Sequence, residues 1–372
     1  MHKKKKEHKK RGIGWTILRI FLGAAGALVL VLVVYIGYLF ASYHRIEDNL
    51  ELEVEKPADG KVEDALEVGK EYSALTYNIG FGAYTPDFSF FMDGGKSSWA
   101  KSKESVLKTV SGAGELAASY DPDFALIQEV DLNSTRSYHV NEYELLKESF
   151  PEYDSVFAQN YDSAFLFYPF TQPHGRSRSG LALFSRYPVT SALRRSFPIS
   201  TSFTKFFDLD RCYSISRVPV ENGKELVIFE LHMSAYGNSD AIREGQINML
   251  CNDMKAEYEA GNYVLCGGDF NHDLKASEDD STEHESWAYP FPREDLPEHF
   301  TFCLDLLSEE EKDDLWDSAR NADMEYVPGV TYTVTLDGFI ISDNLECLSY
   351  ENINSGYSYS DHDPVYLKFK LK

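Results

Sequence analysis

Two short polar motifs in this chain carry side chains that could hydrolyse a phosphate ester. The first is GDFN at residues 268–271, and the second is SDH at residues 360–362, close to the C-terminus. Each borders an apolar run of the kind that forms a buried strand. Carboxylates are ligands that Mg²⁺ prefers, and an imidazole can accept a proton from water near neutral pH. The two motifs therefore point to metal-assisted hydrolysis.

Other polar side chains stand where apolar runs begin or end. Asn78, Glu129 and His232 close such runs, and Asp337 opens one. In a sheet with antiparallel neighbours, the ends of some strands and the starts of others share one edge. Distant parts of the chain can therefore bring acidic, amide and imidazole groups to a single rim, where rigid strands would hold them.

The apolar patterning predicts both strands and helices. Seven short apolar or alternating runs predict strands at residues 72–79, 124–130, 181–185, 226–232, 263–267, 338–342 and 365–371. Apolar residues recur at helical spacing from Trp99 to Ala117 and again from Ile242 to Tyr258. Ser239 is a suitable N-cap for the second helix, and Gly261 is a suitable stop.

Composition and length set broad limits. The 372 residues are enough for two domains, and the 43% hydrophobic and 14% aromatic content exclude a disordered chain. The five cysteines are widely spaced and form no CxxC pair, so we expect reduced, buried thiols rather than a zinc site or a disulfide framework. No G-x-S-x-G or H-E-x-x-H motif supports a serine hydrolase or a zinc protease.

The N-terminal segment has the pattern of a membrane anchor. Residues 21–41 contain no charged side chain, and a helix of that length spans about 31 Å, close to the thickness of a bilayer core. We expect a basic tail at residues 1–14, a transmembrane helix at 15–41 and a linker or short juxtamembrane helix at 42–70. Seven Lys/Arg between residues 3 and 11 predict a cytoplasmic N-terminus, a single membrane pass and an extracytoplasmic remainder.

Two other interpretations of this apolar segment stay open. The first is a cleaved signal peptide, whose apolar region is usually about 7–15 residues long and precedes a small-x-small site; the run here is longer. The second is a buried helix of a soluble domain.

Charge is divided unevenly along the chain. Residues 1–45 carry nine Lys/Arg and one Glu, so residues 46–372 hold the other 27 basic and 59 acidic residues, a net charge of −32. Such a field repels long duplex DNA, although a bound cation and a few arginines can invert it locally. Arg176 and Arg178 are candidates for a phosphate clamp, because guanidinium forks match phosphate oxygens. A solvated turn is the alternative interpretation of this basic pair.

With these motifs in this order, residues 71–372 resemble the endonuclease/exonuclease/phosphatase superfamily. This superfamily includes pancreatic-type deoxyribonucleases, abasic-site endonucleases, inositol-polyphosphate 5-phosphatases and neutral sphingomyelinases. The resemblance implies one α/β domain, a four-layer α/β/β/α sandwich of two mixed sheets flanked by helices. That expectation replaces the two domains that length alone would allow.

The resemblance also implies a metal site. Glu129 and Asp361 match positions that bind a divalent cation, and Asn78 matches the position near metal and phosphate. The implied cofactor is Mg²⁺, with Mn²⁺ as the alternative ion.

The remaining residues receive their roles from the same resemblance. His232 and Asn271 match positions that contact the phosphoryl group, with His232 as a possible acid, and Asp269 matches the position that orients or activates the nucleophile. His362 matches the general base, and Asp337 matches its partner.

Four features depart from the family pattern or stay open. Gly338 stands where the family often has a bulky residue, and Leu231 rather than Thr precedes His232. The family's active-site tyrosine has no certain equivalent, with Tyr161 and Tyr168 as candidates. The aromatic segments 88–92 and 165–170 are either core or a membrane-facing or base-stacking lip.

We therefore expect a metal-dependent hydrolase of phosphodiester or phosphomonoester bonds that is anchored in a membrane and acts outside the cytoplasm. A nuclease-like enzyme is the leading hypothesis. A phospholipid or sphingolipid headgroup phosphodiesterase is the alternative, favoured by the anchor and the acidic surface. A non-catalytic binding module on the same scaffold is a hypothesis of another class. The substrate is thus a nucleic acid or a lipid headgroup, and no protein partner is predicted.

Overall fold

The computed structural model describes residues 12–57, 64–206, 209–234, 240–276 and 288–372. The chain divides into two compact units, Met1–His44 and Arg45–Lys372. The described part of the first unit is dominated by helix α1 (Ile13–Ser42), which by length and composition can cross a membrane. Most of the predicted basic tail lies outside the described residues.

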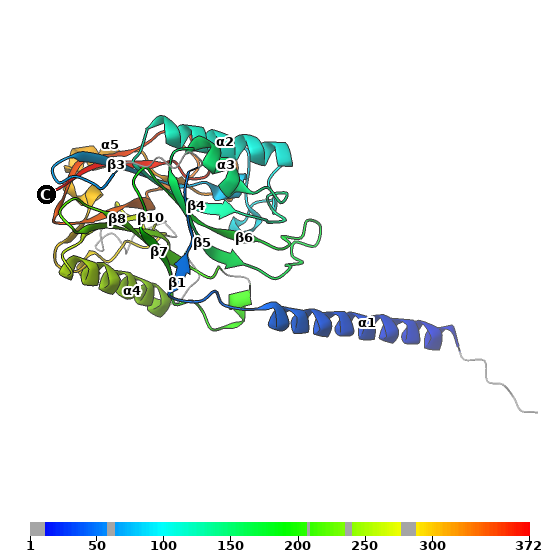
Figure 1. Ribbon diagram of the computed structural model, residues 1–372. Coiled ribbons are helices and arrows are strands. Elements are labelled where there is room, and N and C mark those ends of the chain that lie inside the picture. The colour runs from blue at the N-terminus through cyan, green and yellow to red at the C-terminus, as the bar shows by residue number, and fades with distance from the viewer. Residues whose placement is uncertain (1–11, 58–63, 207–208, 235–239, 277–287) are drawn as a thin grey trace, which may run out of the picture. The chain divides into compact units, whose positions relative to one another are not determined.

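The second unit is built on two seven-stranded mixed sheets (Figure 1). In spatial order, the strands of the first sheet are β1 (Leu50–Leu52), β7 (Ser191–Ser196), β8 (Cys212–Pro219), β9 (Glu225–His232), β10 (Tyr263–Asp269), β14 (Asp337–Ser342) and β11 (Phe300–Phe302). The strands of the second are β15 (Leu345–Asn352), β16 (Val365–Leu371), β3 (Glu71–Asn78), β4 (Phe124–Asp131), β6 (Arg178–Ser185), β5 (Asp154–Asp162) and β2 (Val54–Glu55). A separate short pair joins β12 (Ala319–Arg320) to β13 (Thr333–Val334).

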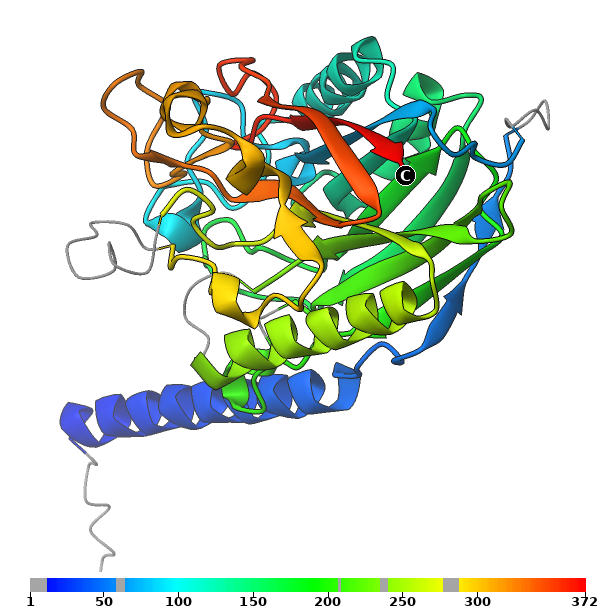
Figure 2. The same ribbon diagram turned by 90° about the vertical axis from the view of Figure 1, so that its left-hand side faces the viewer.

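Helices cover the outer faces of the two sheets (Figures 1 and 2). Helices α2 (Lys103–Ser119) and α3 (Glu142–Ser149) lie on the second sheet, and α4 (Asp240–Glu259) lies on the first. A short fifth helix, α5 (Glu309–Asp314), belongs to the connection before β12. This arrangement confirms the expected α/β sandwich.

The alternation of side chains along β3 and β4 explains why these segments become central strands. Tyr72 and Ala74 pack into the core between the sheets, whereas Leu75 and Tyr77 pack into the core beneath α2 and α3. Both faces of the strands are buried, so the runs are almost wholly apolar. Residues that end these strands are thereby fixed in position.

All seven predicted strands are present, within three residues of their expected ends. The helix predicted from Trp99 begins later, because Ser102 accepts a hydrogen bond from the backbone N–H of Ser105 and caps α2. Trp99 instead lies in the preceding loop. The proposed cap of α4, Ser239, lies outside the described residues, and Gly261 follows the helix with a φ of +86°.

The expected linker at residues 42–70 is partly sheet. Strand β1 pairs with β7, and β2 pairs with β5. Arg45 donates to Asp210 at 2.9 Å, and the backbone N–H of Ile46 donates to the same carboxylate. Short acidic strands at a sheet edge carry little apolar signal, which is why composition alone favoured a connector.

Gly268 permits an unusually close approach between β9 and β10. Its φ is +145°, and a Cβ at this position would lie 2.1 Å from the carbonyl oxygen of Leu231. The approach aligns Asp269 with His232 in the parallel pair. Glycine is therefore required here by backbone conformation and by space.

We predict that Gly268→Ala destabilises the protein by about 3 kcal/mol or more, since it combines backbone strain with a steric clash. Gly223→Ala is the matched control, because Gly223 has a φ of +81° and no atom within 4 Å of a built Cβ. The control should cost about 1 kcal/mol through strain alone. Urea unfolding of the full chain in a mild detergent measures both, and equal losses would contradict the steric argument.

Candidate active site

Strand register brings the predicted residues to one edge of the sandwich. Asp269, at the end of β10, pairs in register with His232 at the end of β9 and with Asp337 at the start of antiparallel β14. In the other sheet, Asn78 ends β3, and the strand that follows His362 runs antiparallel to β3. The register therefore shows the expected convergence of strand ends and strand starts at one edge.

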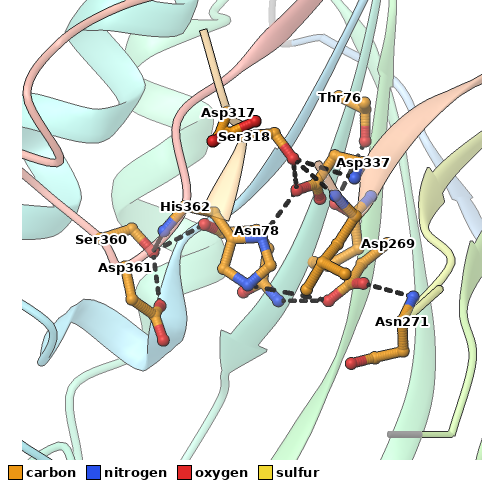
Figure 3. Close-up of polar contacts among 12 residues, drawn as sticks. Thr76, Asn78, Asp269, Asn271, Asp317, Ser318, Asp337, Ser360, Asp361 and His362 are labelled. Atoms are coloured by element: carbon orange, nitrogen blue, oxygen red, sulfur yellow. Dashed lines mark hydrogen bonds and ion pairs between the residues drawn. The ribbon is translucent and has the colours of Figure 1, made fainter. Parts of the chain in front are cut away.

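Asp269 is the centre of the polar cluster (Figure 3). Its Oδ2 accepts a hydrogen bond from Asn78 Nδ2 at 3.0 Å and lies 3.4 Å from His232 Nε2 and 3.9 Å from His362 Nε2. Its Oδ1 accepts from the backbone N–H of Asn271 at 2.8 Å. Burial raises the pKa of Asp269 to about 7, opposed by the positive charge of His362. A carboxyl with this pKa can exchange a proton near neutral pH.

His362 is oriented by a buried chain of hydrogen bonds. Its Nδ1 lies 2.7 Å from Asp337 Oδ2, and Ser318 Oγ donates to the same carboxylate oxygen at 2.8 Å. Ser318 Oγ also accepts from the backbone N–H of Asp337 at 3.0 Å. The second imidazole nitrogen is thereby aimed at Asp269, as Figure 3 shows.

Glu129 is positioned by a bulge in β4. The register with β6 shifts between Ile127 and Val130, and Glu129 has a φ of +57°. A bulge re-aims a side chain at the end of a strand, and non-glycine residues with positive φ cluster at functional sites. The bulge leaves Glu129 Oε1 3.4 Å from Asn78 Nδ2.

The side chains on this side of the cluster fit a divalent cation. Glu129 accepts one long hydrogen bond from Asn78, and Asp361 Oδ1 accepts one from Ser360 at 3.2 Å, so both carboxylates keep lone pairs available among the described residues. Burial raises the pKa of Asp361 to about 6, opposed by the positive charges of His362 and Arg320 and assisted by the negative charge of Glu129. Two nearby carboxylates with open oxygens are what a hard cation binds.

A second group of potential ligands is better explained as a proton-transfer unit. Asp269, Asp337 and His362 place one donor atom each within 4.8 Å of one another. The imidazole Nδ1 is already bonded to Asp337, and Asp337 is also bonded to Ser318. A cation among these three residues would have to displace those bonds, whereas Glu129 and Asp361 present open oxygens.

The two histidines have opposite electrostatic environments. Burial lowers the pKa of His362, but Asp337 most strongly, with Asp269 and Asp361, outweighs burial and raises it well above its ordinary value. Burial and the charge of Arg211 lower the pKa of His232 well below its ordinary value. His232 is therefore a neutral hydrogen-bonding group at neutral pH, which disfavours the acid role considered for it.

The predicted clamp arginines pair with a carboxylate at the end of β5. Arg176 donates to Asp162 at 2.9 Å, and Arg178 lies 3.9 Å from the same carboxylate. In the described part of the chain, no hydrogen bond or ion pair joins either arginine to the cluster around Asp269. Both arginines lie where the loop between β5 and β6 meets β6.

A different arginine provides positive charge at the cluster. Arg211 precedes β8, is 6% exposed, and its charge acts on His232. Its Nε and Nη1 are buried and have no hydrogen-bond partner among the described residues. Sequence reasoning missed Arg211 because β8 was not predicted, and it missed Ser318 because an isolated serine carries no signal.

The structure also explains one departure from the family pattern. A Cβ on Gly338 would lie 2.9 Å from Leu274 and 3.1 Å from the hydroxyl of Tyr350. Tyr350 itself donates to the backbone carbonyl of Asp337 at 3.4 Å. The aromatic ring from β15 thus occupies the space beside Gly338.

Comparison with known proteins identifies the class. The model of the endonuclease/exonuclease/phosphatase family matches residues 75–305, more than half of the chain, and the chain belongs to this family. The family consists of enzymes that hydrolyse phosphate esters. A comparison with curated protein sequences found no significant match.

Solved structures support the fold. An endonuclease/exonuclease/phosphatase from Beutenbergia cavernae is 15% identical, with 81% of this chain and 72% of that chain covered and a TM-score of 0.54. D. rerio TDP2, solved with a single-stranded DNA product, is 14% identical, with coverage of 81% and 100% and a TM-score of 0.53. A family protein from Leptotrichia buccalis is 15% identical, with coverage of 81% and 100% and a TM-score of 0.52.

A row of buried, hydrogen-bonded polar side chains lies beneath the site, two residues before Asn78 and His232 along their strands. Thr76 donates to Gln128 Oε1 at 3.2 Å, and Gln128 Nε2 donates to Glu230 Oε1 at 3.3 Å, which links the two sheets. Glu230 Oε2 is buried and has no partner among the described residues. Burial, opposed by the hydrogen bond from Gln128, raises the pKa of Glu230 well above its ordinary value.

We predict that Glu230→Gln stabilises the protein as pH rises. A carboxyl whose folded-state pKa is raised contributes its full stabilising free energy below the unfolded pKa of about 4.5. This contribution is lost as the pH rises toward the folded-state pKa. Glutamine keeps the shape and has no proton to lose. The excess in unfolding free energy over the parent should grow by about 1.4 kcal/mol per pH unit over that range.

Urea unfolding at pH 5 and pH 8 tests this expectation. The exposed Glu115→Gln on α2 is the control and should show no such pH-dependent gain. A difference between Glu230→Gln and the parent that is the same at both pH values would show that Glu230 is not a buried neutral acid.

Proposed function

We propose that this protein is a Mg²⁺-dependent phosphodiesterase held at a membrane by α1, with its N-terminus in the cytoplasm and its catalytic unit outside. The observation that carries the proposal is the convergence of Asp269, His362 and Asp337 beside the carboxylates of Glu129 and Asp361. Membership of the phosphoesterase family supports the reaction class. The basic segment before α1 supports the orientation.

The residues of the chain divide the reaction between them. His362, oriented by Asp337, takes the proton of the attacking water, and Asp269 holds that water by a hydrogen bond. Neutral His232 and the Asn271 side chain stabilise the phosphoryl oxygens as charge develops. Asn78 donates to both Asp269 and Glu129, so it couples the position of the attacking group to that of the metal-binding side.

Glu129 and Asp361, with Asn78 beside them, would hold Mg²⁺, or Mn²⁺ in its place. When bound, the ion would polarise the phosphoryl group and neutralise its negative charge. Its positive charge would also offset the negative charge of the carboxylates that keep His362 protonated. His362 could then lose its proton, and only the deprotonated imidazole can accept a proton from water.

Arg211 is the residue that we propose as the phosphate-binding cation, in place of Arg176 and Arg178. Its buried, unused N–H groups beside His232 support this role. A guanidinium fork that faces a phosphate is more strongly held when it is pre-oriented and shielded from water.

Two substrate classes remain under test. A nucleic-acid phosphodiester is favoured by the likeness to a TDP2 structure that contains single-stranded DNA. A phospholipid or sphingolipid headgroup is favoured by the candidate membrane helix and by the exposed aromatic side chains between β5 and β6.

We predict that His362→Ala lowers kcat by about 10²–10⁴-fold on the true substrate, because it removes the proton acceptor while leaving the fold intact. The assay is a panel of single-stranded DNA, RNA, phospholipids, sphingomyelin and phosphoinositides, each with Mg²⁺ and with EDTA. His299→Ala is the control, because His299 pairs with Asp343 at an exposed site. Unchanged turnover by His362→Ala would reject the role, and no Mg²⁺-dependent turnover on any substrate would favour a binding module.

We also predict that Glu129→Gln raises the Mg²⁺ concentration for half-maximal activity by about tenfold or more, since it removes one anionic ligand. Activity measured against Mg²⁺ concentration gives the value, and Glu115→Gln is the matched control. An unchanged half-maximal concentration would place the cation elsewhere in the site.

A further inference from the structure

A group of large apolar side chains is exposed near the candidate active site. Met92 is 60% exposed, Phe167 50%, Tyr168 64% and Phe170 84%. We call these four residues the aromatic lip. Such a concentration of exposed apolar surface usually marks an interaction site.

The lip is a contiguous surface built from two segments. Met92 belongs to a short 3-10 turn at Phe91–Asp93, and the other three residues lie in the loop that joins β5 to β6, which projects beyond the two strands in Figure 1. The ring of Phe91 lies 5.9 Å from that of Tyr168, which lies 5.9 Å from that of Phe170. The two segments therefore act as one patch.

The loop that carries the lip is braced before any partner binds. The indole N–H of Trp99 donates to the carbonyl of Pro173 at 2.7 Å, and Gln172 Oε1 accepts from the backbone N–H of Ser98 at 2.9 Å. A surface that is already ordered loses less conformational freedom when it docks.

Aromatic contacts connect the lip to the catalytic cluster. Phe91 contacts Phe90 with ring centroids 5.0 Å apart, and Phe90 contacts Phe81 at 6.0 Å. Tyr84 packs against Phe81 at 5.3 Å, and the negative charges of Asp361 and Glu129 act on its hydroxyl. The exposed patch thus begins a few side chains from the proposed metal-binding carboxylates.

The loop segment of the lip carries no charged side chain, whereas Asp93 follows Met92 in the other segment. Residues 163–175 contain no Asp, Glu, Lys or Arg. Burial lowers the pKa of their one histidine, His174, to about 4, so it is neutral at pH 7. The arginine that follows the loop, Arg176, is paired with Asp162.

These features favour a lipid surface over a nucleic acid. Proteins that stack single-stranded bases combine their aromatic residues with a positively charged groove along the phosphates. The lip has no such groove, and the chain after residue 45 has a net charge of −32. Aromatic side chains without neighbouring charge partition into the interfacial zone of a bilayer.

We propose that the aromatic lip docks the catalytic unit onto a phospholipid bilayer, with Phe170 and Tyr168 inserted in its interfacial zone. Only Tyr43 and His44 separate the end of α1 from Arg45, the first residue of the second unit, so the covalent link would keep this unit close to any membrane that α1 crosses. The docking needs no catalytic step, so its test does not depend on whether the proposed reaction is correct.

The test places a reporter at the most exposed lip residue. Full-length Phe170→Trp is assembled into nanodiscs of phosphatidylcholine with and without brominated acyl chains, and its emission is corrected by subtraction of the parent protein. Bromine quenches only indoles that enter the bilayer, so the added emission should fall by about half or more. Leu306→Trp, at a residue 55% exposed in another part of the unit, is the control and should not be quenched.

A second variant confirms that the lip itself inserts. Phe170→Trp combined with Tyr168→Asp should lose the quenching, because a carboxylate resists entry into the interface, while the urea midpoint stays that of the parent. Both altered side chains are mainly exposed, so the fold does not depend on them.

Three results would overturn the proposal. The first is equal quenching at positions 170 and 306. The second is quenching of the residue-170 emission by a single-stranded oligonucleotide without quenching by brominated lipid, which would make the lip a base-stacking surface. The third is a blue-shifted emission that neither quencher reduces, which would mean that protein, such as a second copy of this chain, covers the lip.

Discussion

The concentration of buried negative charge at one edge of the sandwich is the constraint on which the rest of the site depends. Asp269, Asp337 and Asp361 come together there with Glu129, and removing such charges from water is costly unless each is compensated. The structure compensates part of the cost with Ser318, Asn78 and the backbone N–H of Asn271. The raised pKa values of Asp269 and Asp361 show that the compensation is incomplete. Further positive charge would complete the compensation, and the proposed divalent cation would add it to that of His362.

The same constraint explains why two histidines in one site behave differently. His362 lies among carboxylates, which favour its charged form, while burial and the charges of Arg211, His362 and Arg136 favour the neutral form of His232. One imidazole is therefore suited to exchange a proton and the other to donate a hydrogen bond without changing charge. Environments that push the pKa values of like residues apart are how a fold assigns separate roles to them.

Sequence reasoning found the positions that strand ends determine and missed those that depend on three-dimensional packing. Asn78, His232 and Asp269 were predictable because each ends an apolar run that is buried on both faces. Arg211 was not, because β8 alternates Ser and Arg with apolar residues and lacks a continuous apolar run. Arg176 and Arg178 were selected for being basic in an acidic chain, yet the nearest carboxylate in space, Asp162, already pairs with them.

The segment between the apolar helix and the domain shows the same limit. Its two short strands are held by backbone pairing with β7 and β5, and such pairing requires only an extended segment beside an open sheet edge. Composition could not reveal it. The seven longer strands, by contrast, were recognised because burial on one or both faces forces a pattern on the sequence.

The acidic exterior and the site make different demands on a substrate. At physiological ionic strength a charge is screened beyond about 8 Å, so a distant surface carboxylate would have little effect on a single phosphate group at the proposed site beside Arg211. A polyanion is different, because its successive phosphates must lie along the acidic exterior as well as in the site. The net charge of −32 after residue 45 therefore opposes a long nucleic acid more than it opposes a single phosphodiester. With the proposed cation and Arg211 beside it, such a site within an acidic domain would favour a substrate that presents one phosphodiester at a time.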